Sequence, residues 1–361
     1  MLSFFISFIW FVFLIMVLVF VHELGHFIAA RFFGVRVEVF SVGFGQRLYH
    51  KIDKKGTEWR IAWIPLGGYV KMFGDFGPAS IENKEVMADM TEEERRVSFH
   101  SKKLWQKSII AFAGPAFNYI LAVVVLAIMV YMQGISIIKP KISEILDSSP
   151  AAQAGFKVGD LILSINDKKI DNFLELREII GVEKDLPLKV EIDRGNSVLE
   201  LIVEPYKKNI DGVESYYLGI KCTEIETRSA NVIESVINAN KVAYTLCREI
   251  LQSLGKMITG NKELLQNIGG PVKIVEYASQ SIEYGIASML WLLATLSINL
   301  CILNLLPIPI LDGGHLLFYA IQGVFGPLPS KIQNAGYWFG GMLLLFVMIF
   351  ATWNDIISFI K

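Results

Sequence analysis

Cysteine is scarce in this 361-residue sequence, and its pattern excludes two common kinds of structural support. The three cysteines, Cys222, Cys247 and Cys301, form no Cys-x-x-Cys pair, and their number is odd. A disulfide framework needs an even set of cysteines, and a thiolate zinc site needs paired ones. Any metal bound by this chain should therefore have histidine and carboxylate ligands.

An excess of charge of either sign is also absent. The 34 basic and 35 acidic residues leave a formal net charge of −1, so no basic surface predicts a nucleic-acid partner. By contrast, 53% of the residues are hydrophobic and the mean hydropathy is +0.46. Soluble domains have roughly 45–50% apolar residues, so the composition favours a protein surrounded by membrane lipids.

Charged side chains are missing from long stretches of the chain. From Phe4 to Val21 every residue except Ser7 is apolar, and residues 108–138, 284–311 and 332–354 contain no Asp, Glu, Lys or Arg. Each stretch can hold a helix of the ~20 residues needed to cross a bilayer. We therefore predict an α-helical polytopic membrane protein with about four transmembrane helices. A signal peptide is the alternative for the first stretch, but residues 1–5 lack its basic start.

A shorter apolar piece, from Ile61 to Met72, is only about half a membrane thickness long as a helix. It contains Pro65, Gly67 and Gly68, which break helices. We predict a strand or re-entrant structure here, that is, a membrane-associated β element.

Basic residues indicate the orientation in the membrane. None precedes the first apolar stretch, whereas Arg31 follows it closely and Lys107 directly precedes the second one. The positive-inside rule then places residues 31–107 in the cytoplasm. The N-terminus, the long segment between the second and third helices, and the C-terminus are expected outside.

The external segment is predicted to hold a folded domain. Residues 188–192 alternate as in a strand, and residues 194–196 give a turn signal. Apolar residues between Val232 and Leu254 recur at helical spacing, which fits either a packed face or a helix on the membrane surface. We expect four parts: residues 1–134 and 284–361 as the two halves of a membrane core, 135–222 as an α/β domain, and 223–283 as an amphipathic helical linker.

The residues best suited to chemistry are His22-Glu23-Leu24-Gly25-His26, inside the first predicted helix. Residues four apart share a helix face, so His22 and His26 can bind one ion while Glu23 is free to act as a general base. Two packed histidines are the structural alternative. Ionisable groups in a bilayer cost about 2.5 kcal/mol or more each on insertion scales, so three of them within five positions favour a compensating dication. We predict Zn²⁺ as the cofactor.

A catalytic zinc also needs a third protein ligand. The segment from Asn304 to His315 closes the third apolar stretch and supplies Asp312. If the first and third helices cross in the same direction, His22 and Asp312 lie toward the same, cytoplasmic side and can meet. A solvated carboxylate at a helix end is the alternative for Asp312, and His315 is a weaker ligand candidate because it follows two glycines.

Five segments together resemble the site-2 protease family of intramembrane metalloproteases, in particular the bacterial type that cleaves anti-sigma factors. The matching segments are His22–His26, Gly43–Gly45, Pro65–Met72, Gly114–Asn118 and Asn304–His315. The resemblance implies an enzyme of the bacterial inner membrane that cuts single-pass membrane proteins. An anti-sigma factor or remnant signal peptides are the substrates that the family implies.

The same resemblance implies roles for individual residues. It makes Asp312 the third zinc ligand and Glu23 the base, and it places Asn304 and Asn118 as polar groups lining the cleft. It also implies that an edge strand pairs with substrate that has been unwound into extended form. The residues of this strand are Gly67, Gly68, Tyr69 and Val70.

The external domain resembles a circularly permuted bacterial PDZ domain. The resemblance rests on residues 149–155 and 159–166 and on Tyr217-Leu218-Gly219-Ile220. It implies a peptide groove at Leu218, Gly219 and Ile220, where backbone amides could bind a carboxylate. A domain that only screens substrates by size is an equal alternative.

Two other kinds of function compete with a protease. An inactive scaffold would have no reason to keep His22, Glu23, His26 and Asp312 together. A metal transporter would need polar residues along a path through the bilayer, and the second and fourth apolar stretches lack such a series.

Overall fold

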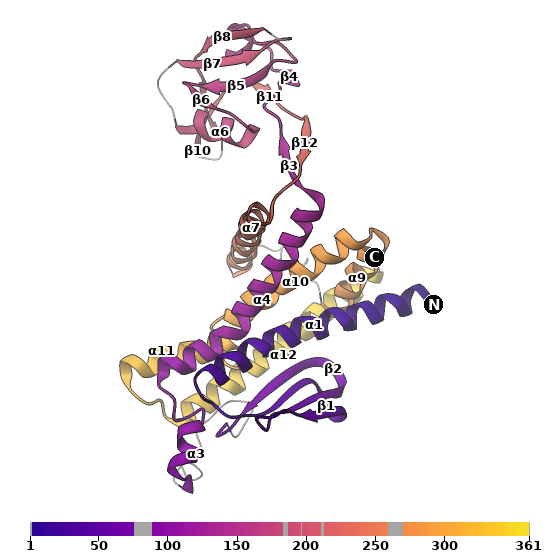
Figure 1. Ribbon diagram of the computed structural model, residues 1–361, viewed down its shortest axis with the longest axis vertical. Helices are drawn as coiled ribbons and strands as arrows, with labels where there is room; N and C mark the ends of the chain where they lie inside the picture. The colour runs from indigo at the N-terminus through magenta and orange to yellow at the C-terminus, as the bar shows by residue number, and fades with distance from the viewer. Residues whose placement is uncertain are drawn as a thin grey trace. The chain divides into compact units, whose positions relative to one another are not determined.

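The computed structural model of the protein describes residues 2–75, 89–182, 187–195, 197–210, 213–258 and 270–360. The chain forms two compact units, one made of Met1–Met129 with Val232–Lys361 and the other of Val130–Asn231. Long helices dominate the first unit and short strands the second (Figure 1).

The first unit contains α1 (Leu2–Phe32), β1 (Val37–Ile52), β2 (Glu58–Met72), α3 (Glu92–Val97), α4 (Leu104–Gln133), α7 (Val232–Ile258), α9 (Pro271–Glu283), α10 (Ile286–Leu305), α11 (Asp312–Phe325) and α12 (Ser330–Ile360). The second contains β3 (Ile135–Ile138), β4 (Glu144–Ile145), α5 (Pro150–Gln153), β5 (Leu161–Ile165), β6 (Lys168–Lys169), α6 (Phe173–Val182), β7 (Leu188–Asp193), β8 (Val198–Val203), β9 (Tyr206–Ile210), β10 (Val213–Tyr217), β11 (Ile220–Lys221) and β12 (Ile225–Arg228).

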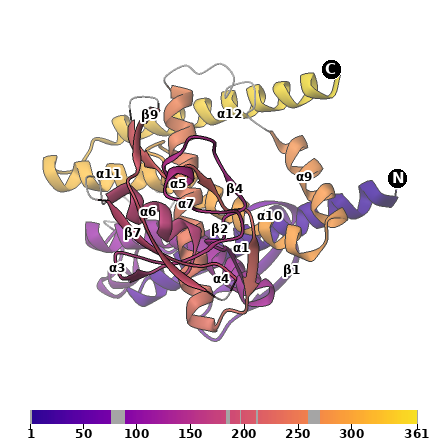
Figure 2. The ribbon, with the colours of Figure 1, turned by 90° about the horizontal axis from the view of Figure 1, so that it is seen from above.

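Four helices in the described part of the chain are long and apolar enough to cross a membrane, as predicted. The candidate spans are Phe5–Phe32, Leu104–Gln133, Ile286–Leu305 and Ser330–Ile357, which lie in α1, α4, α10 and α12. A helix suits the bilayer because it satisfies its own backbone polar groups. An even number of crossings returns the chain to its starting side, and both termini lie toward the same end of the first unit (Figures 1 and 2).

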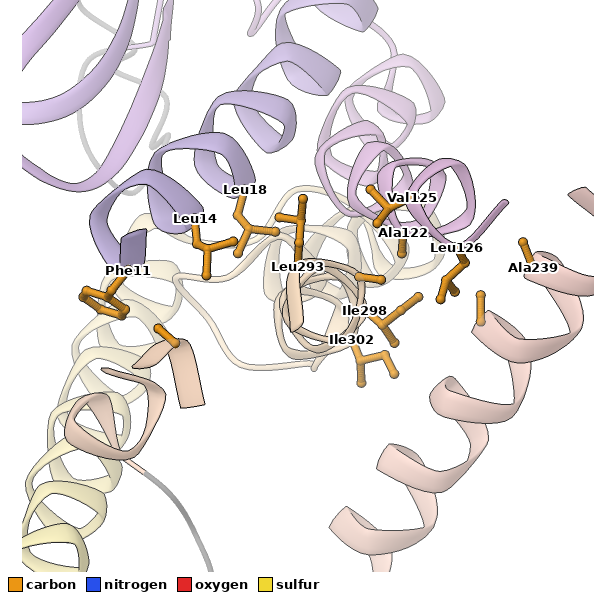
Figure 3. Packing of buried hydrophobic residues seen from close by; sticks show 13 residues of the cluster. Phe11, Leu14, Leu18, Ala122, Val125, Leu126, Ala239, Leu293, Ile298 and Ile302 are labelled. Atoms are coloured by element: carbon orange, nitrogen blue, oxygen red, sulfur yellow. The ribbon is translucent and has the colours of Figure 1, made fainter. Parts of the chain in front are cut away.

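The first unit has its apolar core around α10. Figure 3 shows buried side chains of α1, α4, α7 and α10 that belong to one cluster, among them Leu14, Ala122, Ala239 and Ile298, all fully buried. On α7, Ala239 and Ala243 are both inaccessible to solvent, and their small size allows close approach to the spanning helices. Other apolar residues of α7 remain exposed, namely Val232, Ile233, Val236, Ile237 and Leu251, so both alternatives for this amphipathic helix stay open.

The hairpin of β1 and β2 lies along α1 (Figure 1). The strands pair from Ile52 beside Glu58 at the turn to Val37 beside Met72 at the open end, and they bend so that residues 39–42 of β1 lie between residues 58–61 and 68–71 of β2. On its buried side Phe40 stacks against neighbouring aromatic rings of the hairpin and α1. The piece that was too short for a spanning helix is therefore a strand, as predicted.

Two close contacts hold the helices that carry the candidate site. A Cβ atom added to Gly25 of α1 would lie 2.7 Å from the carbonyl carbon of Ala113 in α4, so these helices cross with almost no side chain between them. The hydroxyl of Ser297 in α10 donates to the carbonyl oxygen of Asn118 in α4 at 2.7 Å. Small residues and interhelical hydrogen bonds are common means of helix packing in membranes.

The second unit is built on a four-stranded antiparallel sheet in the order β6-β5-β7-β8. Leu188, Val190 and Ile192 of β7 alternate into its core and are fully buried, which matches the alternation seen in the sequence. Strand β12 pairs with β3, so residues 223–231, expected in the linker, belong to this unit.

Candidate active site

The candidate site begins on one turn of α1. His22 and His26 lie on the same helix face, and their Nε2 atoms are 3.2 Å apart. The imidazole rings meet edge to face with centroids 4.8 Å apart. This is the arrangement expected from histidines spaced four apart.

The first residue of α11 completes the cluster. Asp312 places Oδ2 3.2 Å from Nε2 of His22 and Oδ1 3.4 Å from Nε2 of His26. Its position depends on a tight connection to α10, because a Cβ atom added to Gly313 would overlap the carbonyl groups of Leu305 and Leu306. Two segments far apart in the sequence therefore meet, as the topology predicted.

The three side chains fit a zinc ion. Their donor atoms all lie within 4.8 Å of one another, and the three closest separations are 3.2, 3.2 and 3.4 Å. Tetrahedral zinc with bonds of 2.0–2.1 Å separates its ligands by about 3.3 Å. The side chains are also largely buried, at 11% exposure for each histidine and 17% for Asp312, so a cation would offset the mutual repulsion of their lone pairs.

Groups behind the histidines fix the direction of their lone pairs. Nδ1 of His26 lies 2.8 Å from the carbonyl oxygen of Ile110. Since a carbonyl only accepts, Nδ1 carries the proton and Nε2 presents its lone pair to the cluster. Such a partner is typical of histidines that bind metals.

Asn118 occupies the same place behind the other histidine. Its side-chain nitrogen lies 3.1 Å from Nδ1 of His22, while its Oδ1 is buried and has no hydrogen-bond partner among the described residues. Turning the amide over would let Oδ1 accept a proton from Nδ1, and amide orientation is inferred from such networks. We predicted Asn118 in the cleft, but it is fully buried and absent from the lining residues. The prediction that Asn118 lines the cleft is therefore wrong, because α4 points this side chain toward α1.

Glu23 lines a cleft of about 720 Å³ that also contacts His22, His26 and Asp312. Val70 of β2 lines the cleft beside Glu23, and a Cβ atom added to Gly68 would lie 3.2 Å from Glu23 Cγ. The open end of the hairpin thus contacts the predicted base directly. This leaves Glu23 close to the three candidate ligands without being one of them.

The cleft contains most of the residues predicted to contact substrate. Asn304, Gly68, Tyr69 and Val70 line it. Gly67 is not among the lining residues; it has a φ of +113° and faces the ring of Phe44. Sequence reasoning missed several other lining residues, which are Phe44, Lys71, Asp75, Ile310 and Leu311.

Gly114 was noted in a motif, but its role was missed. A Cβ atom there would lie 2.6 Å from Cε1 of His26 and 2.8 Å from Cε1 of His22. The glycine therefore makes room for both imidazoles. A glycine four residues before Asn118 on the same helix was the available signal, since residues at this spacing share a face.

The residues predicted to form a peptide groove lie in the second unit. Leu218 contributes its side chain to the core, Gly219 has a φ of +78° and backs onto Ser149, and Ile220 begins β11. The carbonyl groups of Leu218 and Gly219 accept hydrogen bonds from Ala151 and Leu146.

Two histidines and a free glutamate on a bilayer-length helix, together with a carboxylate at the start of α11, define a metal-dependent hydrolase of the membrane. Comparison with known proteins narrows this class. The model described as "Peptidase family M50" matches residues 10–348, so the chain belongs to peptidase family M50, the site-2 proteases.

Relatives along nearly the whole chain carry matching names. "Putative zinc metalloprotease Atu1380" of Agrobacterium fabrum is 35% identical over 97% of this chain and 95% of the relative. "Metalloprotease MmpA" of Caulobacter vibrioides is also 35% identical, over 99% of this chain and 96% of the relative. The protein is accordingly a zinc metalloprotease with zinc as its cofactor.

Among solved structures, the PDZ domain of HtrA3 bound to a phage-derived ligand matches 18% of this chain and 62% of that chain. The sequence identity is 30% and the TM-score is 0.17, which is too low to establish a shared fold.

Proposed function

We propose that this metalloprotease hydrolyses peptide bonds within or near the transmembrane segments of single-pass membrane proteins. The observation that supports this most strongly is the position of His22, Glu23 and His26 inside a candidate membrane span. Ionisable groups at such depth are costly and usually functional. A protease for soluble substrates would gain nothing by burying its site there.

His22, His26 and Asp312 would hold the zinc ion. When bound, zinc supplies a Lewis acid that makes water more acidic and polarises a carbonyl group. Glu23 takes a proton from the attacking water and later gives it to the leaving amine. Val70 lies beside Glu23 in the cleft, and the amide of Asn304 can donate to the oxygen of the scissile carbonyl.

The substrate would bind as an extended strand. A helical peptide bond is hydrogen-bonded and sterically shielded, so a transmembrane helix must unwind before it is cut. Gly68, Tyr69 and Val70 line the cleft next to Glu23, and the edge of β2 can pair with an extended segment through main-chain hydrogen bonds.

We further propose a place in the bacterial inner membrane. The basic residues between α1 and α4 support a cytoplasmic location of the hairpin and of the active site. The second unit would then lie outside the cytoplasm as a PDZ-like domain that binds or screens substrates through Leu218, Gly219 and Ile220. An anti-sigma factor or remnant signal peptides would be the substrates, and membrane lipids surround the helices.

Substrate trapping tests this proposal. Glu23→Gln keeps the size of the side chain and removes the base, so zinc and substrate should still bind while cleavage falls by about 10²–10⁴-fold. Glu92→Gln, on the exposed face of α3, is the matched control. Cross-linking in membranes, followed by mass spectrometry, should recover intact single-pass proteins with Glu23→Gln only. Normal cleavage by Glu23→Gln, or capture of soluble proteins alone, would contradict the proposal.

A further inference from the structure

The turn that leads into Asp312 contains a strained residue. The N–H of Leu311 donates to the carbonyl oxygen of Ile308 at 3.0 Å, which closes a turn with Pro309 and Ile310 at its centre. Ile310 has a φ of +95°. Proline followed by a residue with positive φ is the pattern of a type II turn, whose second central position normally holds glycine or asparagine. A β-branched residue is the least suited to this conformation.

Neighbouring helices impose this turn shape. A Cβ atom added to Gly314 of α11 would lie 2.6 Å from the carbonyl carbon of Ile308, and one added to Gly340 of α12 would lie 2.8 Å from that of Pro309. The backbone of the turn therefore packs directly on the backbones of two helices. Any residue at position 310 must accept the positive φ, and glycine would do so without strain.

The side chain of Ile310 is only partly buried, so burial offsets this strain only in part. It is 44% exposed and lines the cleft together with Glu23 and Phe44. Its Cδ1 atom lies 3.9 Å from the place of a Cβ atom on Gly341, so only its tip approaches α12. Strain that persists at an exposed position next to a reactive site indicates a functional role for the side chain.

We propose that Ile310 determines specificity: its side chain forms a wall of the subsite that receives the substrate side chain next to the scissile bond, and it limits the size of that side chain. The inference rests on the proposed function, because it requires a peptide extended across the cleft. Side chains of an extended strand alternate between two faces, so one beside the scissile bond can point toward the turn. Branching at Cβ makes isoleucine stiff, so the wall cannot move aside for a large residue.

The test separates the strain from the side chain. Ile310→Ala removes the branched side chain but keeps the strained Cβ atom, whereas Ile310→Gly removes both. Each is compared with the wild type in thermal unfolding and in cleavage of reporter substrates with Ala or Phe at the positions flanking the cut, which is mapped first by mass spectrometry. Ile128→Ala, an exposed isoleucine on α4, controls for the loss of any surface isoleucine.

Both variants should raise the rate on the Phe substrate relative to the Ala substrate by about tenfold or more. Only Ile310→Gly should also raise the midpoint of thermal unfolding, by about 2 °C, and the control should change neither quantity. If the wild type cuts the substrates but both variants keep its Phe-to-Ala ratio, or if Ile310→Gly lowers the midpoint, the inference is overturned. A wild type that cuts neither substrate refutes the proposed function, and the inference falls with it.

Discussion

Adding one methyl group to Gly114 should damage the metal site without unfolding the helix around it. The new Cβ atom would lie 2.6 Å from Cε1 of His26 and 2.8 Å from Cε1 of His22. Ordinary van der Waals contact begins at about 3.4 Å. The imidazole of His22 would therefore have to move by about 0.6 Å, and that of His26, whose Nε2 lies closer still, by more than about 0.8 Å.

Such a shift is large for a metal site. Ligand distances in a sound site stay within about 0.2 Å of their usual values, and loss of a contact that orients a ligand costs about 10–100-fold in metal affinity. We expect Gly114→Ala to raise the Kd for zinc about 100-fold, which corresponds to about 2.7 kcal/mol. Alanine is favoured over glycine in a helix by about 1 kcal/mol, so the zinc-free variant should remain folded.

A zinc titration followed by thermal unfolding measures this difference. Gly255→Ala in α7 is the matched control, because an added Cβ atom there would meet none of the described residues within 4 Å. At one zinc concentration well above both dissociation constants, the wild type and the control should gain the same stability, and Gly114→Ala should gain about 2.7 kcal/mol less. Wild-type zinc affinity in Gly114→Ala would refute the packing of both imidazoles against α4.

Three further substitutions test other contacts. Asp312→Asn should lower zinc content and cleavage together, by about tenfold or more, because an amide is a poorer ligand than a carboxylate; retained zinc in metal analysis would exclude Asp312 as a ligand. Asn118→Leu should weaken zinc binding about 10–100-fold. Asn118→Asp can still accept a hydrogen bond from the N–H of His22 and should keep the wild-type zinc affinity. If both variants lose the same zinc affinity, Asn118 acts only through packing. Burial raises the pKa of Asp160, but hydrogen bonds from Arg194 and a backbone N–H outweigh this effect and hold the pKa below its usual range. The stability of the second unit should therefore be constant above about pH 4 and should fall as the pH drops through the lowered pKa. Asp160→Asn should remove this pH dependence and lower the stability by about 1–2 kcal/mol. Hydrogen exchange on the full chain measures the pH dependence and the stability loss.

The parts of the fold that the sequence predicted depend on local pattern. Uncharged stretches of bilayer length predicted the four candidate spans, because hydrocarbon tolerates few charges over such a distance. The first and third spans cross the membrane in the same direction, and this predicted that Asp312 and the histidines of α1 could meet. Neither step required knowledge of how the helices pack.

The sequence did not predict which face each spanning helix turns toward its neighbours, and Asn118 shows why. An amphipathic helix reveals its buried face through the period of its apolar residues, but α4 is apolar nearly all round. The sequence could place Asn118 on a spanning helix near the site, yet not decide whether it faced the cleft or α1. Ile310 was missed for a related reason, since a proline predicts a turn but an isoleucine after it does not predict a positive φ.

The positions of the candidate ligands depend on close backbone contacts more than on the ligand side chains themselves. Gly25 lets α1 touch α4, Gly114 leaves room for the imidazoles, and Gly313 lets α11 begin against the end of α10. A methyl group at any of these positions would displace a ligand or its helix by more than the ~0.2 Å that a metal site tolerates. A glycine in an apolar segment does not reveal which distant backbone it touches. The chemistry of this enzyme could therefore be predicted from four side chains, while the geometry that makes them effective could not.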